Sequence, residues 1–103
     1  ETRADLVQRS MGHACEWETS MILRIAPQLV KDISGLQTVP VEFGFEPAYR
    51  GWTTKDRTVP GHMGSPQHAS ADKGEHLFAQ FAQGASEFLS TVAAWDGSGN
   101  WGA

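Results

Sequence analysis

The sequence predicts an α/β fold, because two stretches have the apolar spacing of amphipathic helices and a third has the period of a strand. Residues 15–26 and 70–92 place apolar side chains at steps of three and four, whereas residues 39–45 alternate in a period of two. An amphipathic helix must bury its apolar face, so the helix over 70–92 is expected to cover a sheet. At 103 residues, 40% of them hydrophobic, the chain is one domain at most.

The first helix is expected to begin near Cys15 and to end at Ala26, because Pro27 has no N–H to donate. Its apolar stripe consists of Met21, Ile22, Ile25 and Leu29. A step of three residues back from Met21 reaches Glu18, which is therefore expected to face inward, while Glu16 lies about 200° round the helix. A buried carboxylate needs a metal, a cation or several N–H donors to compensate its charge.

His13 lies in a Gly-containing turn just before this helix, where an imidazole can exchange protons near neutral pH. We expect His13 and Glu18 to form one wall of an active site. Substitution of Glu16, which lies off the inward stripe, is expected to change metal content and turnover little. The same residue types also occur in ordinary proteins, where the Glu complements the helix dipole and the His is solvated. The spacing H-x4-E is not a specific motif by itself.

The strand over 39–45 is confined to an edge or an irregular extended segment by Pro40, which cannot donate to a ladder. Residues 46–72 contain almost no periodic apolar positions and are expected to be loop, which a compact domain seldom tolerates unless another surface orders it. Within this loop, site-lining or substrate-contacting roles are open to Arg50, Trp52, His62 and His68. Surface loops carry such residues for many other reasons.

The last helix has Ser70 as a good N-cap and Asp72 in the first turn, where negative charge is favoured. Its apolar face consists of Phe78, Phe81, Ala85, Phe88 and Val92. Gly74 and Gly84 each cost about 1 kcal/mol relative to Ala in a helix, so they are expected to allow close approach of a strand or loop. His76 lies off the apolar face and is expected to be exposed.

Composition excludes several functions. A net charge of −4 without a basic cluster argues against nucleic acid as a partner. The single cysteine, Cys15, forms no internal disulfide and is expected to be a buried structural thiol. No run approaches the ~18 apolar residues of a membrane span, so a soluble cytoplasmic protein without a membrane partner is expected. We divide the chain into a domain over 1–94 and a Gly-rich tail over 95–103.

Two blocks of the sequence resemble a known family. The run from His13 to Leu23, followed by Pro27-Gln28-Leu29-Val30, resembles the H-[AG]-G-x-x-E-T-S-x-M-L…P-[DQ]-L-V segment of the creatininase (creatinine amidohydrolase) family. The second block, residues 60–65 and 69–75, resembles the glycine loop and the A-[ST]-x-[ED]-K-G-E helix start of that family. Two motifs in the right order make the resemblance specific, and it covers roughly residues 11–91.

The resemblance implies a layered α/β/α creatininase-like fold, of which this chain would be the C-terminal portion. It implies a metal-dependent amidohydrolase that cleaves an amide or related C–N bond in a small polar substrate with divalent metal ions such as Zn, Mn or Fe. By the same resemblance, His13 is the active-site His that hands a proton to the leaving nitrogen, and Glu18 is a metal ligand or orients one. A cytoplasmic homo-oligomer such as a hexamer is expected.

The main metal ligands of the family are a Glu-x-His pair, a following Asp and a Gly-His segment, which have no counterpart in this chain. We therefore expect the N-terminal portion of the same protein, as a separate chain or a missing segment, to hold the metals, and this chain to be inactive alone. Gly12 replaces an acidic residue of creatininase, which counts against creatinine itself as the substrate, and Cys15 replaces a Gly. These departures motivate the alternative of a non-catalytic assembly or binding subunit that retains the fold.

Overall fold

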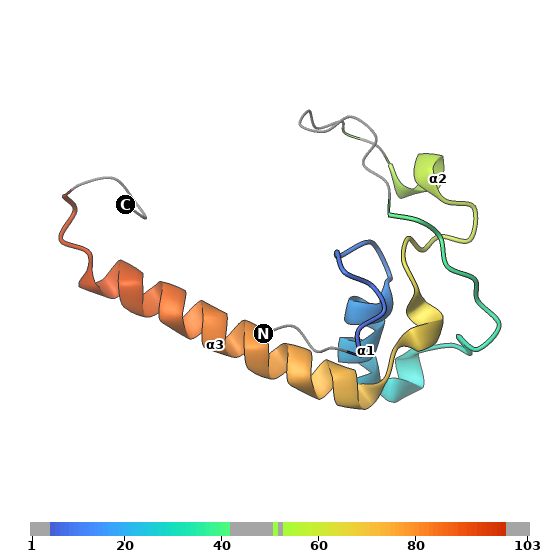
Figure 1. Cartoon of the computed structure of the whole chain (residues 1–103), viewed down its shortest axis with the longest axis horizontal. Helices are drawn as coiled ribbons and strands as arrows, with labels where there is room; N and C mark the ends of the chain where they lie inside the picture. The colour runs from blue at the N-terminus through green and yellow to red at the C-terminus, as the bar shows by residue number, and fades with distance from the viewer. Residues whose placement is uncertain (1–4, 42–50, 52, 99–103) are drawn as a thin grey trace.

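The computed structural model describes residues 5–41, 51 and 53–98, in which two α-helices cross and irregular segments pack beside them (Figure 1). The helical elements in chain order are α1 (Glu16–Ile25), the 3-10 turn η1 (Pro27–Leu29), α2 (Thr54–Arg57), the 3-10 turn η2 (Pro66–His68) and α3 (Ala71–Ala94). The described residues are therefore mostly helical, and the predicted layered arrangement is not visible in them. Within the described ranges, no helix is long and apolar enough to cross a membrane.

Helix α1 confirms the helix predicted over 15–26. Its N-cap, Cys15, is fully buried and has an ordinary extended backbone with φ −92°. The left-handed conformation of this turn falls on Ala14, at φ 45°, where an L-residue pays roughly 1–2 kcal/mol. Cys15 therefore occupies the position of a Gly without backbone strain. At the other end, Pro27 opens η1 and the N–H of Ala26 donates to the carbonyl of Ile22.

Helix α3 begins as predicted, with the Ser70 side chain accepting the N–H of Lys73 at 3.3 Å. The predicted close approach at Gly74 is confirmed, although the neighbour is a helix. A Cβ on Gly74 would lie 2.0 Å from the carbonyl oxygen of Ser20 in α1. The same expectation for Gly84 is wrong in the described part of the chain, since no atom lies within 4 Å of its Cβ position.

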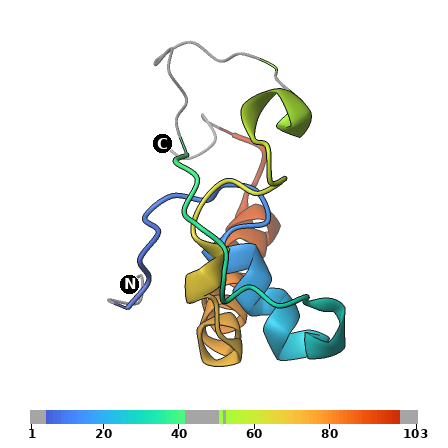
Figure 2. The ribbon, with the colours of Figure 1, turned by 90° about the vertical axis from the view of Figure 1, so that its right-hand side faces the viewer.

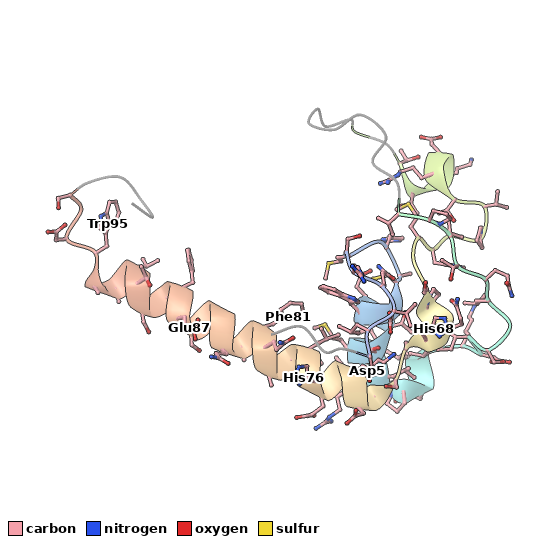
Figure 3. All side chains as sticks on the ribbon, viewed as in Figure 1. Asp5, His68, His76, Phe81, Glu87 and Trp95 are labelled. Atoms are coloured by element: carbon pink, nitrogen blue, oxygen red, sulfur yellow. The ribbon has the colours of Figure 1, made fainter. Side chains whose placement is uncertain are left out.

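The C-terminal part of α3 extends away from α1 and the segments beside it (Figures 1 and 2). Residues 81–98 are all exposed, and Figure 3 shows Glu87 and Trp95 on this extended part. Phe81 is 43% exposed, Phe88 55% and Trp95 47%. The sheet that α3 was expected to cover is absent from the described residues.

In the described segments, extended backbone pairs at two isolated antiparallel bridges. Val39 exchanges hydrogen bonds of 3.0 and 2.7 Å with Gly64, and His13 exchanges bonds of 3.0 and 2.8 Å with Met63. Because Met63 and Gly64 are consecutive, their backbone hydrogen-bonding groups point to opposite sides of the chain. The Met63–Gly64 segment therefore lies between the segment that contains His13 and the one that contains Val39. Most of the strand predicted over 39–45 lies outside the described residues.

The stretch expected to be loop, residues 46–72, contains two short helical pieces, α2 and η2. Arg50 and Trp52, for which substrate contact was considered, lie outside the described residues.

Candidate functional site

A shallow pocket of about 480 Å³ opens beside the N-terminal end of α1. Its polar side chains include His13, Glu18, Thr19 and His62. Most of the remaining wall is apolar: Ile22, Leu29, Val30, Ile33, Leu36, Pro60 and Pro66. A mostly apolar hollow with a few convergent polar groups is the usual form of a small-molecule site.

His13 is positioned by backbone bonds to Met63, while its side chain remains exposed at the pocket. The neighbouring residue must be glycine in this arrangement, because a Cβ on Gly12 would lie 2.0 Å from the carbonyl oxygen of Met63. No acidic side chain could stand at position 12 without moving the bridge that holds His13. The backbone of His13 is therefore held in place, while its imidazole ring is accessible from the pocket.

Glu18 lines the same pocket from the first turn of α1, so the structure brings the two predicted site residues together. Its Oε2 atom is buried and has no hydrogen-bond partner. The N-terminal end of the helix compensates part of a negative charge there, but a buried oxygen without a donor is costly. The pocket therefore favours a ligand that brings a cation or an N–H group to Glu18.

Glu16 has a different environment, and the expectation that its side chain lies off the buried face of the helix is wrong. It does point away from the Glu18 face, as the helix geometry predicted, but that other side is the contact with α3. Glu16 is fully buried, with Oε1 2.6 Å from Lys73 Nζ and Oε2 accepting the backbone N–H of Gln8 at 2.7 Å. The prediction failed because it took the apolar stripe as the buried face, whereas Ile22 and Ile25 are 38% and 60% exposed.

Gln8 is a structural residue of the site that the sequence did not single out. It is only 7% exposed, and its Oε1 accepts the backbone N–H groups of Ser65 at 3.0 Å and Glu16 at 3.3 Å. Its carbonyl accepts the indole N–H of Trp17 at 2.9 Å. Gln8 thus joins the start of α1 to the segment that holds His13. Its segment has no apolar periodicity, so no local signal marks it.

The other histidines divide into three environments. His62 is 6% exposed and lines the pocket, with Nε2 2.8 Å from the carbonyl oxygen of Gln37. His68 is exposed and does not line the pocket. His76 was expected to be exposed, which is wrong: it is half-buried on α3, and its Nε2 is buried without a hydrogen-bond partner.

Across the described ranges, no group of three or more His, Cys, Asp or Glu side chains could hold a metal ion. Glu18 offers one carboxylate, and stable catalytic sites use about three protein ligands. These residues alone therefore do not fit a metal centre. A metal at the pocket would need ligands from outside the described residues.

The comparisons with known proteins give one match. The family model described as Creatininase, creatinine amidohydrolase, matches residues 1–89. This span contains the pocket, α1 and the part of α3 that packs against α1. Neither the curated proteins nor the solved structures gave a match.

Proposed function

The chain belongs to the creatininase family, and from this premise we propose that it supplies one wall of a site that hydrolyses an amide or related C–N bond in a small polar substrate. Membership suggests an α/β fold and a metal-dependent amidohydrolase. The finer assignment concerns what His13 and Glu18 do in that chemistry.

The observation that carries the proposal is the pairing, in one pocket, of an accessible imidazole with a buried carboxylate oxygen that lacks a donor. In C–N hydrolysis, a water oxygen bonds to the carbonyl carbon, the C–N bond breaks, and the nitrogen leaves with a proton. His13 is the group at this pocket that can hand over that proton. Glu18 holds the N–H edge of the substrate or contributes to a metal centre. The apolar wall limits the access of bulk water to the bound substrate.

The remaining metal ligands belong, in this proposal, to further polypeptide that completes a layered α/β/α fold. This polypeptide is the N-terminal portion of the same protein, as a separate chain or a missing segment. Support comes from the exposed apolar side chains beside the pocket. Ile25 is 60% exposed and Leu29 is 72% exposed. Exposed apolar side chains are unfavourable in water and are normal at a surface that another polypeptide covers.

The test uses the chain together with whatever polypeptide it co-purifies with from its own cells. Elemental analysis should find divalent metal in that assembly and none on the separated chain. The assembly should release free amine or ammonia from at least one member of a panel of small linear and cyclic amides. An assembly without metal and without turnover on the whole panel would refute the hydrolase proposal.

A non-catalytic subunit that retains the fold is the second candidate, favoured by the absence of a three-ligand cluster from the described residues. The sequence of the partner polypeptide separates the two. If it lacks a Glu-x-His pair, an Asp and a Gly-His segment, the assembly role is correct.

A further inference from the structure

His62 lines the pocket, and the proposed function gives it no task. Its side chain belongs to the segment before η2 and is only 6% exposed, whereas His13 is exposed at the same pocket. The backbone of His62 is held on both sides. Its carbonyl accepts the hydroxyl of Thr58 at 2.6 Å, and the next residue, Met63, forms the bridge to His13. The imidazole of His62 is therefore positioned before any ligand arrives, which lowers the entropic cost of binding.

The hydrogen bond to Gln37 determines which ring nitrogen of His62 carries the proton. Nε2 lies 2.8 Å from the carbonyl oxygen of Gln37, and a carbonyl oxygen only accepts. Nε2 therefore donates, which leaves Nδ1 of the neutral ring as an acceptor. Among the described residues, Nδ1 has no hydrogen-bond partner. Because His62 lines the pocket, Nδ1 is the ring atom left to a ligand.

Two further polar side chains of the pocket also offer acceptors. Glu18 Oε2 is buried without a donor. The hydroxyl of Thr19 donates to the carbonyl of Ala14 at 3.4 Å, which leaves the lone pairs of this hydroxyl to a ligand. Within the described lining, His13 is the side chain that can bring a proton. The pocket thus complements a ligand rich in N–H donors, because an acceptor left unpaired beside an apolar wall is costly.

We propose that His62 Nδ1 accepts a hydrogen bond from an N–H group of the substrate, and so selects amides and ureas that keep a hydrogen on nitrogen. This selection rests on the proposed function, and it holds whether Glu18 holds the substrate or contributes to a metal centre. A ketone, an ester or a fully alkylated amide has the carbonyl group but offers no N–H to Nδ1. A site built to bind a donor rejects such analogues far more strongly than apolar contacts can.

Two cyclic carbonyl compounds of nearly the same shape test the proposal in the assembly described above. Imidazolidin-2-one carries an N–H on each side of its carbonyl group, and cyclopentanone has a methylene group at each of these places. Ligand-detected NMR measures both dissociation constants without any turnover. Imidazolidin-2-one should bind at least about 10-fold more tightly, the usual effect of one hydrogen bond to a buried acceptor.

Two substitutions separate the roles of the two ring nitrogens. The side-chain amide of Gln reaches the level of Nε2, so His62→Gln keeps a donor for the Gln37 carbonyl and loses the acceptor. It should weaken the binding of imidazolidin-2-one about 10-fold and that of cyclopentanone less than about twofold. The shorter amide of Asn lies at the level of Nδ1, so His62→Asn keeps an acceptor there. This variant should bind imidazolidin-2-one within about threefold of the unchanged protein.

A purely structural role of His62 would reverse the order of the two variants, since only His62→Gln preserves the bond to Gln37. That reversal would overturn the proposal, as would equal affinity of the unchanged assembly for the two ligands. Equal weakening of both ligands by His62→Gln would overturn it as well.

Long-range proton–nitrogen NMR of labelled His62 gives a second, direct readout. Nε2 should carry the proton, and the Nδ1 signal should shift on addition of imidazolidin-2-one but not of cyclopentanone. A protonated Nδ1 in the neutral ring, or an Nδ1 signal that does not respond, would contradict the assignment. Neither readout requires hydrolysis. An assembly that binds in this way but cleaves no amide would therefore refute the hydrolase proposal and leave the selection by His62 standing.

Discussion

Lys73 Nζ lies 2.6 Å from Glu16 Oε1, and this ion pair ties the first turn of α3 to the first turn of α1. The Glu16 side chain is fully buried and that of Lys73 is 11% exposed. The ammonium also donates to the carbonyl of His68 at 2.8 Å. A buried carboxylate depends strongly on the cation paired with it, and Lys73 is the cation that the described residues place against Glu16.

Lys73→Met should therefore lower the free energy of unfolding by about 3 kcal/mol or more, as measured by chemical denaturation. The matched control is Arg24→Met, which breaks the Arg24–Glu75 pair between the same two helices. That pair is exposed, at 50% and 60%, so its loss should cost less than about 1 kcal/mol. Equal effects of the two substitutions would contradict the assignment of Lys73 to a buried pair.

Gly74→Ala should destabilise the helix crossing, since the added methyl would overlap the carbonyl oxygen of Ser20 and force α1 and α3 apart. A loss of about 1–3 kcal/mol is expected from such overpacking. Gly84→Ala has open space and should instead raise stability by roughly 0.5–1 kcal/mol through helix propensity. Thermal unfolding of the two variants measures whether each substitution lowers or raises the stability of the protein.

Gln8→Ala should leave the backbone N–H groups of Glu16 and Ser65 without their shared acceptor. Each buried donor without a partner costs about 1–3 kcal/mol, so the loss should exceed that of an ordinary surface change. Hydrogen exchange at Ser65 and Met63 should accelerate, because the same loss loosens the segment that holds His13. Unchanged protection at both amides would show that Gln8 does not position this segment.

His13→Ala and Glu18→Ala should fail in different ways in the metal-loaded assembly. His13→Ala should lower turnover by roughly 10²–10⁴ with metal content and melting temperature nearly unchanged. Glu18→Ala should lower metal affinity by roughly 10–100-fold, and excess metal should restore part of the activity. Glu87→Gln, on exposed α3, serves as the control for loss of a carboxylate. Loss of metal in His13→Ala would reverse the two assignments.

Asp32 should titrate below its usual range, because the backbone N–H and then the hydroxyl of Ser34 donate to its carboxylate and lower its pKa. A folded-state pKa below the unfolded one means that the turn is stabilised above the unfolded pKa. This stabilisation is lost as the pH falls through the folded pKa. Ser34→Ala should raise the pKa of Asp32 only part of the way, since the backbone donor remains. An NMR titration of the two proteins measures the difference.

The helices were predictable because their signals are local. Pro27 ends α1, Ser70 caps α3, and the apolar steps between such markers need no knowledge of the rest of the chain. The shared pocket position of His13 and Glu18 was predictable for the same reason, since His13 shortly precedes the helix and Glu18 lies in its first turn.

The buried polar contacts were not predictable from local signals. Glu16 is paired with a lysine far along the sequence, and Gln8 with the backbone of Ser65, so neither has a marker near itself. Helical periodicity identified the apolar face of α1 but could not predict which face is buried. The Ser20 side of α1 is buried instead, because Gly74 has no Cβ and lets α3 approach α1 there.

The bridges at Val39 and Met63 also bear on how this protein can diversify. Val39 is bonded to Gly64, and Met63 to His13, so both ends of the intervening segment are anchored by backbone hydrogen bonds that do not depend on the residues between them. The entropy of closing a loop rises only logarithmically with its length, about 0.6 kcal/mol for each doubling. Insertions and deletions between the anchors are therefore inexpensive. A change of length between the anchors would alter the approach to the pocket near Pro60 while the imidazole of His13 keeps its place.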